Sequence, residues 1–308
     1  MPYVALAPAT REARSAAATA RWQSILAARP ELLPAISLQR ELLGIVADLA
    51  DALDHGRMPR LALPPKYLTV KLLGGVPALS GESIPLPIPL MKPAIARVCD
   101  ALARGGAGAA ADHIGAQVDE TRIDAGSLLA ASLRRDQHAL RTGAEHRGLA
   151  PDLLWLVAEL VVSPFAYLLQ RDLLGSAEDG SPLCDALNSW SHGYCPSCSS
   201  WPAIAEVVST HRVLRCSFCS LAWEPRRYAC VYCGEAGDTF VTAAPDDERP
   251  DRRLEACSAC GAYLKTLDMP VLSPFPTSAI SDLETMELDV AAMERGYRRP
   301  PLKEFGKP

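Results

Sequence analysis

The sequence lacks the motifs that most enzymes use for catalysis. It has six histidines, and none stands in an HExxH or ExxH pattern that would place a metal on a helix. It has no phosphate-binding loop of the form GxxxxGK[ST], since the glycine-rich residues 104–108 lack the lysine and the preceding strand. Ser127 and Ser132 have no nucleophile-elbow context. The sequence therefore predicts a protein that is not an enzyme.

Features of membrane and polyanion binding are also scarce. Residues 1–15 lack a cationic start followed by an apolar stretch, so we expect no secretory signal. The most apolar run, residues 153–169, is interrupted by Glu159, Ser163 and Pro164, and we expect a core helix kinked at Pro164 rather than a spanning helix. A formal charge of −5 disfavours non-specific binding to phosphate backbones or anionic membranes. We therefore expect a cytoplasmic protein without a membrane partner.

The N-terminal part is rich in alanine and leucine, and its apolar residues recur with helical spacing. This spacing predicts helices over residues 11–29, 31–55, 94–104, 109–118, 127–141 and 151–174. Prolines interrupt residues 57–93, and we expect residues 85–89 to be extended, because proline fixes φ and disfavours helix in the preceding residue. We expect this strip to be a loop packed on its own domain, with a partner-docking strip as the alternative.

The sequence changes character after a turn-rich linker at residues 175–182. Short β-prone runs at residues 205–208, 213–215 and 240–244 predict strands, and apolar spacing from residue 278 predicts a last helix that ends near Gly296. The predicted fold class is α plus small β, with an all-helical N-terminal domain, two cysteine-containing ribbon modules and a C-terminal helix. We place the domains at residues 1–183, 184–226, 227–275 and 276–308.

Eight of the ten cysteines form four CxxC pairs. In chain order these are Cys195 and Cys198, Cys216 and Cys219, Cys230 and Cys233, and Cys257 and Cys260. The first two pairs are separated by 17 residues, as in known zinc sites, and the last two by a slightly longer 23. In a reducing compartment such cysteines favour metal binding over disulfides. We therefore predict two tetrahedral four-cysteine metal ions, with iron or zinc at each site.

Two ligand pairings are open. Sequential pairing joins the first CxxC with the second and the third with the fourth, and crossed pairing joins the first with the third. We favour sequential pairing because it needs only short hairpins. Gly234 and Gly261 follow the second cysteine of their turns, where a positive φ is often required. Ser199 and Ser220 occupy the matching places in the first unit and depart from that pattern.

Such four-cysteine metal sites could have either of two roles. Four-cysteine sites most often only hold a small fold together, and a redox or metal-relay role is the alternative. Sulfur fills all four positions around each ion, so we do not expect hydrolysis at the metal. Thiol exchange through a single CxxC is disfavoured, because it would require a βαβ pattern. Cys99 is expected in the core and Cys184 has no assigned role, while His192 and His211 flank cysteine turns as possible replacement ligands.

A set of arginines lies among the cysteines and includes Arg212, Arg215, Arg226, Arg227, Arg249, Arg252 and Arg253. One hypothesis is a nucleic-acid-binding zinc ribbon in which Trp223, Tyr228 or Tyr232 stacks on bases. We favour a solvated face on which nearby acids balance these charges. The candidate acids are Glu224, Glu235, Asp246, Asp247 and Glu248.

The residues around the cysteines resemble those of the formate dehydrogenase accessory protein family, the FdhE type. The matching runs are residues 193–198, 215–219 with Trp223, Arg227 with 230–233, 255–260 with 263–265, and then 282–283, 288–289 and 294–297. The similarity is specific from about residue 190 to residue 297. In the helical part before residue 190 it rests only on the general sequence pattern and the length of the chain. Ser199, where a glycine is usual, is a departure from the family pattern.

This resemblance implies rubredoxin-like sites in which the eight paired cysteines are the metal ligands and iron is as plausible as zinc. It also implies that the protein is cytoplasmic and acts as a chaperone in protein maturation. A molybdenum-containing formate dehydrogenase would need it for activity. The expected partner is the catalytic subunit of that enzyme, bound before export and assembly. The sequence does not indicate an oligomeric state.

Overall fold

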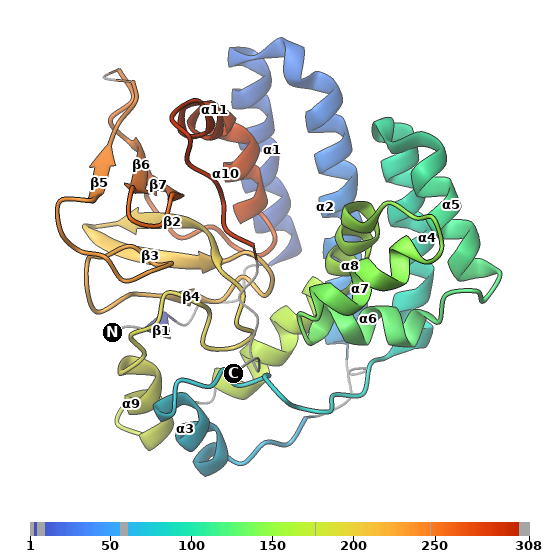
Figure 1. Ribbon diagram of the computed structural model, residues 1–308, viewed down its shortest axis with the longest axis horizontal. Coiled ribbons are helices and arrows are strands. Elements are labelled where there is room, and N and C mark those ends of the chain that lie inside the picture. Colours follow the sequence, from blue (N-terminus) through green and yellow to red (C-terminus); the bar gives the residue numbers. More distant parts are fainter. Residues whose placement is uncertain (1–2, 5–9, 56–60, 176, 247, 302–308) are drawn as a thin grey trace. The chain divides into compact units, whose positions relative to one another are not determined.

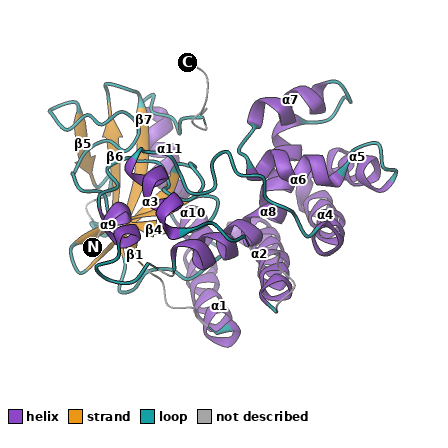
Figure 2. Ribbon diagram, turned by 90° about the horizontal axis from the view of Figure 1, so that it is seen from below, coloured by secondary structure: helices purple, strands orange, loops and turns teal. Residues whose placement is uncertain are grey.

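A computed structural model describes residues 3–4, 10–55, 61–175, 177–246 and 248–301. The chain divides into two compact units. Among the described residues, the sheet unit comprises 3–4, 10–15, 63–80, 174–175, 177–246 and 248–301, and the helical unit comprises 16–55, 61–62 and 81–173. The strands, orange in Figure 2, belong to the sheet unit. The observed fold is therefore α plus small β, as the sequence predicted.

The helical unit consists of helices, several of which pack against α4. Its helices are α1 (Arg11–Ala28), α2 (Leu33–Asp54), α4 (Ile88–Leu102), α5 (Gly108–Asp119), α6 (Ala125–Leu133), α7 (Gln137–Glu145) and α8 (Pro151–Leu174). Most of α1 lies in this unit. The short turn η1 (Pro30–Leu32) precedes α2, and the π-helical turn η2 (Ala103–Ala107) joins α4 to α5. Helix α4 packs against α2, α5 and α6. The apolar stripe of α2 that predicts a helix, including Leu42, Ile45 and Leu49, is buried.

Helix α8 corresponds to the most apolar run of the sequence. It is long and apolar enough to cross a membrane, but 67% of its most apolar stretch is buried inside the protein. Val157, Val162 and Phe165 are fully buried. The helix continues through Pro164 to Leu174. Helix α8 is therefore buried like a core helix, as the sequence predicted.

Two predictions about the helical unit are wrong in detail. Residues 127–141 form parts of two helices, because the Asp136 side chain caps a new helix by accepting a hydrogen bond from the Ala139 N–H at 3.0 Å. Residues 85–89 are not extended throughout, because α4 already begins at Ile88. Pro89 lies in the first turn of α4, where its missing N–H removes no helical hydrogen bond.

Two helices of the sheet unit were not predicted. They are α3 (Pro65–Leu73) and α9 (Pro182–Asn188), and each begins at a proline. The prolines suggested loops, yet a proline at the first helical position is preorganised for helix. The two helices pack against each other. The region before residue 175 also contains a strand, β1 (Tyr3–Val4), so the expectation that it is all helical is wrong there.

A seven-stranded sheet runs in the order β1-β4-β3-β2-β7-β6-β5. Its other strands are β2 (Pro202–Val208), β3 (His211–Cys216), β4 (Ala222–Trp223), β5 (Phe240–Ala243), β6 (Arg252–Cys257) and β7 (Ala262–Asp268). Neighbouring strands are antiparallel except for the central pair, β2 and β7, which is parallel. Strands β2–β4 come from the first cysteine-containing segment and β5–β7 from the second. Both segments thus share one sheet, and separate domain boundaries at residues 226 and 275 stay a prediction.

Helices α10 (Ser278–Glu284) and α11 (Met286–Glu294) pack against strands of the sheet (Figure 1). The sequence predicted one helix here, but the chain leaves helical geometry at Thr285, where φ is −124°. Leu254 and Tyr263 of the sheet pack against Leu288 and Ala292 of α11. The covering helices therefore close a small apolar core over β6 and β7.

A buried lysine fixes α11 on the sheet. Lys265 of β7 is 1% exposed, and its Nζ lies 2.7 Å from Asp282 Oδ1 and 2.8 Å from Asp289 Oδ2. The Tyr263 hydroxyl donates a hydrogen bond to Asp289 at 2.7 Å. Because a buried charge is costly unless it is paired, these contacts specify where the helices rest.

Candidate metal centres

The eight paired cysteines lie in two groups of four. The first cluster consists of Cys195, Cys198, Cys216 and Cys219, and the second cluster of Cys230, Cys233, Cys257 and Cys260. Within each cluster all four sulfur atoms lie within 4.8 Å of one another. The structure thus brings the first CxxC to the second and the third to the fourth, which is the sequential pairing and not the crossed one.

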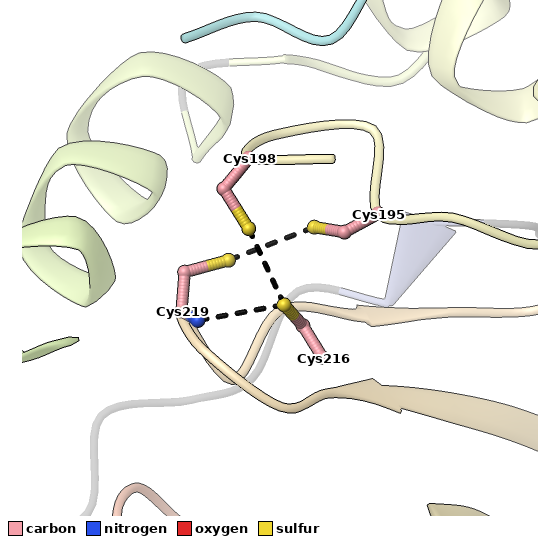
Figure 3. A group of neighbouring side chains, drawn as sticks. All are labelled: Cys195, Cys198, Cys216 and Cys219. Carbon is pink, nitrogen blue, oxygen red and sulfur yellow. Dashed lines mark hydrogen bonds between the residues drawn. The ribbon is translucent and has the colours of Figure 1, made fainter. Parts of the chain in front are cut away.

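The spacing of the sulfurs fits a four-coordinate ion. In the first cluster, Cys195 Sγ lies 3.6 Å from Cys219 Sγ, and Cys198 Sγ lies 3.4 Å from Cys216 Sγ. Figure 3 shows the two turns facing each other with their sulfurs directed toward a common centre. Four sulfurs at about 2.3 Å from one metal would be separated by roughly 3.8 Å, so only a small adjustment is needed.

The second cluster has nearly the same dimensions. Cys230 Sγ lies 3.7 Å from Cys260 Sγ, and Cys233 Sγ lies 3.6 Å from Cys257 Sγ. Both donor sets consist of four sulfurs, which suits Zn²⁺ and equally a single iron. The two clusters could therefore each hold a metal ion.

All four cysteine turns share one backbone conformation. The residue after the second cysteine has a positive φ in each turn: 68° at Ser199, 54° at Ser220, 82° at Gly234 and 69° at Gly261. The N–H of that residue donates to the carbonyl oxygen of the first cysteine, at 3.1 Å in the Ser199 turn and 2.8 Å in the Gly234 turn. The positive φ expected at Gly234 and Gly261 is confirmed, and Ser199 and Ser220, which depart from the glycine pattern, nevertheless take a positive φ as well.

Main-chain amides point at sulfur in the first cluster. The N–H of Ser197 donates to Cys195 Sγ, and those of Phe218 and Cys219 donate to Cys216 Sγ, each at 3.4 Å. Hydrogen bonds of this kind favour the thiolate form, which is the form that binds a metal. The turns therefore supply both the ligands and part of their electrostatic stabilisation.

The two clusters differ in exposure. All four cysteines of the first cluster are buried, whereas Cys233 of the second is exposed and Cys260 is half-buried. Burial raises the pKa of Cys195 well above its ordinary value, because a thiolate is costly in an apolar interior. At Cys257 burial is the largest influence and acts in the same direction, but hydrogen bonds from the main chain of Cys260 and Ala259 and from the neighbouring thiols together outweigh it and lower the pKa. A cation would favour the thiolates in both clusters.

A segment more than a hundred residues earlier in the sequence forms main-chain hydrogen bonds with the first cluster. The N–H groups of Ala78 and Leu79 donate to the carbonyl oxygens of Pro196 and Ser197, each at 2.8 Å. The Lys71 ammonium holds this segment by donating to Ala78 O at 2.9 Å and to Ser80 O at 2.6 Å. This support could not be predicted from the sequence, since main-chain pairing over more than a hundred residues leaves no local pattern.

The remaining cysteines and histidines lie outside the clusters. Cys99 is buried in α4, and burial raises its pKa to about 12, as suits a core residue. Cys184 is buried in α9 and accepts a hydrogen bond from Asn188. His211 pairs with Glu224 at 3.1 Å, and His192 stacks on Tyr194 with ring centroids 4.8 Å apart. Among the described residues, neither histidine belongs to a group that could hold a metal.

Most of the arginines of this region are paired with acids, but not with the acids expected, of which Asp247 lies outside the described residues. The face is not solvated throughout, because Arg215 is fully buried and the Arg212 side chain is 10% exposed. The observed pairs are Arg212 with Glu255, Arg215 with Glu206, Arg249 with Asp251, Arg252 with Glu284 and Glu287, and Arg253 with Asp268. Trp223 is 1% exposed and is not available to stack on a base. Arg226 and Arg227 are exposed, and neither has an ion-pair partner within the described part of the chain.

Comparison with known proteins gives a consistent group of relatives, although no family model matches the chain. The chain is 29% identical over 113 residues to an FdhE homologue of Aquifex aeolicus, and the match covers 35% of this chain and 40% of the relative. It is 33% identical over 115 residues to one of Pseudomonas putida, covering 34% and 36%. A third, from Haemophilus influenzae strain PittEE, is 26% identical over 196 residues, covering 61% and 64%. The matched regions thus span less than two thirds of these relatives.

A solved structure extends the similarity to the fold. The crystal structure of the FdhE protein from Pseudomonas aeruginosa superposes with a TM-score of 0.59 at 23% identity, covering 98% of this chain and 97% of that one. At this identity the match shows a shared fold alone. The chain is thus similar in sequence to several FdhE homologues and shares the fold of an FdhE protein over nearly its whole length.

Proposed function

We propose that this protein is a maturation factor for a molybdenum-containing formate dehydrogenase. It would bind the catalytic subunit of that enzyme in the cytoplasm before export and assembly. Two features support this role: the similarity to FdhE homologues, and the two sets of four sulfurs, each matched to a tetrahedral ion. The second feature carries the proposal, because it is observed in this chain itself.

The ligands proposed for the two ions are the eight cysteines of the first and second clusters. A bound ion would cross-link the two turns of its cluster, and iron would in addition supply a one-electron couple. One apolar cluster of the sheet unit is small and lies over β6 and β7. A structural ion contributes roughly 10–16 kcal/mol of apparent binding energy in small metal domains, which is enough to decide whether such a unit folds.

We infer a role in protein binding rather than in catalysis. Sulfur would fill all four positions around each ion, so no position is left for a substrate or a reactive water. The first cluster is buried and suits a structural role, whereas the partly exposed second cluster could respond to redox state. Iron and zinc both fit the sulfur geometry, and the visible spectrum of freshly purified protein distinguishes them, because iron thiolates are coloured and zinc thiolates are not.

Deletion of the gene in its host tests the function. We expect loss of formate oxidation, restored by the wild-type chain and not by a chain with Cys195→Ser and Cys198→Ser. A matched variant, Cys99→Ser and Cys184→Ser, removes two cysteines outside the clusters and is expected to restore activity. Formate oxidation and cofactor content of the catalytic subunit that stay unchanged after deletion would overturn the proposal.

The alternative is a nucleic-acid-binding zinc ribbon. It has less support, because five of the seven arginines near the clusters are paired with acids. A salt-dependent shift of labelled RNA or DNA by the intact protein would favour this alternative.

A further inference from the structure

A pocket of about 630 Å³ lies beside the second cluster. Its walls come from the segment that precedes the first cluster and from the turn that carries Cys230 and Cys233. The residues important here are His192, Tyr194, Trp201, Arg226, Arg227 and Tyr232. This volume is within the range of sites that hold small ligands or several side chains of a partner.

The aromatic walls of the pocket are held in place by one another. Trp201 packs edge-on against Tyr232, with ring centroids 5.2 Å apart, and against Tyr194 at 6.2 Å. The Tyr194 hydroxyl donates to Gly75 O at 2.8 Å, and the Tyr232 hydroxyl donates to Tyr263 O at 3.2 Å. Because these rings are fixed, the pocket is largely preformed, which lowers the entropic cost of binding.

Arg226 and Arg227 give the pocket a positive rim. Both are exposed, whereas the other five arginines of this region are paired with acids. The whole chain has a formal charge of −5, so this rim is a local exception. Two neighbouring guanidinium groups match carboxylates and phosphates in geometry and charge.

Exposed apolar side chains lie in a segment that contacts a wall of the pocket. The wall residue His192 lies against Gly75, so that a Cβ at Gly75 would be 2.7 Å from His192 Nε2. On either side of Gly75, Leu73 is 65% exposed and Val76 is 42% exposed. The surface thus combines two cations, aromatic walls and an apolar border.

We propose that this pocket binds an acidic segment of a partner protein, with carboxylates on Arg226 and Arg227 and apolar side chains against Leu73 and Val76. The arginines lie at an exposed rim, and the apolar border extends outside the pocket, so the surface suits a polypeptide better than a small anion. The inference rests on the proposed function for its choice of a protein partner. It names the chemistry of the docking surface, which the proposed function does not.

The test is a peptide titration of the full-length, metal-loaded protein. The probe is a short fluorescent peptide that alternates glutamate with leucine, and its glutamine counterpart is the control ligand. We expect saturable binding of the glutamate peptide that weakens with salt. The variant Arg226→Gln with Arg227→Gln should bind about tenfold more weakly, since two exposed ion pairs together contribute about that factor.

A matched variant, Arg249→Gln with Arg295→Gln, removes the same charge outside the pocket and should bind like the wild type. Metal content and the melting midpoint confirm that both variants are folded. Equal binding of the peptide by the Arg226/Arg227 variant and the wild type would overturn the inference. So would arginine-dependent binding of inorganic pyrophosphate or an RNA oligonucleotide in place of the peptide. Because the titration needs no formate dehydrogenase, its failure leaves the gene-deletion test of the proposed function unaffected.

Discussion

Gly193 lies against the main chain of Val231 so closely that a Cβ on Gly193 would be 1.8 Å from the Val231 carbonyl oxygen. Gly193 lies two residues before Cys195 of the first cysteine turn, and Val231 lies inside the third turn, between Cys230 and Cys233. The two clusters are therefore joined through direct backbone contact. Only glycine allows this approach, which couples the position of one centre to that of the other.

Replacement of Gly193 should separate the two turns. We expect Gly193→Ala to cost about 1–3 kcal/mol of stability, because the neighbouring atoms are main-chain atoms and cannot rotate away. A lower midpoint of thermal unfolding would show this. In Gly44→Ala the new methyl group meets nothing within 4 Å, so this control should keep or slightly raise the midpoint. A Gly193→Ala protein as stable as the wild type would show that the contact is not required.

The difference in exposure between the clusters predicts two rates of metal release. A chelator should remove the ion of the second cluster quickly, because Cys233 is exposed, and that of the first cluster slowly, because all four of its cysteines are buried. Released metal can be followed with a coloured indicator. Cys233→Ser should abolish the fast phase and leave the slow one. Release of both ions at one rate would contradict this account.

The left-handed turns predict opposite effects for serine and glycine. Ser220→Gly should stabilise the first cluster by up to about 1 kcal/mol, because glycine adopts a positive φ without strain. Gly234→Ser should destabilise the second cluster by a similar amount, since no atom lies within 4 Å of its new Cβ and only the backbone cost remains. Urea unfolding monitored by circular dichroism would measure both. Changes of the same sign would contradict the backbone explanation.

The carboxylate of Asp282 gives a prediction for acid pH. Burial alone would raise its pKa, but Lys265 and Arg299 outweigh burial and hold the pKa of Asp282 below its ordinary value of 3.8. The stabilising effect is therefore complete above that value and is lost as pH falls through the lower pKa of the folded state. The Asp282 side chain is 45% exposed, so the effect should be less than about 1 kcal/mol. The stability difference between the wild type and Asp282→Asn should shrink on acidification, and a difference that grows would contradict the assignment.

The sequence predicted those parts of the structure that depend on local patterns. The spacing of the CxxC pairs is enough to indicate which turns meet, because a short hairpin can bring only neighbouring pairs together. The apolar stripe of α2 likewise identifies a helix, because its period is that of a buried helical face. Positive φ was expected at Gly234 and Gly261, whereas at Ser199 and Ser220 only the structure reveals it.

Contacts between distant segments could not be predicted in this way. The parallel pairing of β2 with β7 joins the two cysteine modules, and nothing in either strand specifies its partner. The same holds for the hydrogen bonds from Ala78 and Leu79 to the first cysteine turn. At α3 and α9 the prolines predicted loops, but each of these helices begins at a proline. The arginine partners were also unpredictable, because they lie on strands and helices that only the fold brings together.

The most direct test of this account is the metal content of full-length protein purified under reducing, oxygen-free conditions. The account predicts two ions per chain, iron or zinc, with the eight cluster cysteines protected from thiol reagents until the metal is removed. A folded protein that contains no metal, with those eight thiols freely reactive, would contradict it.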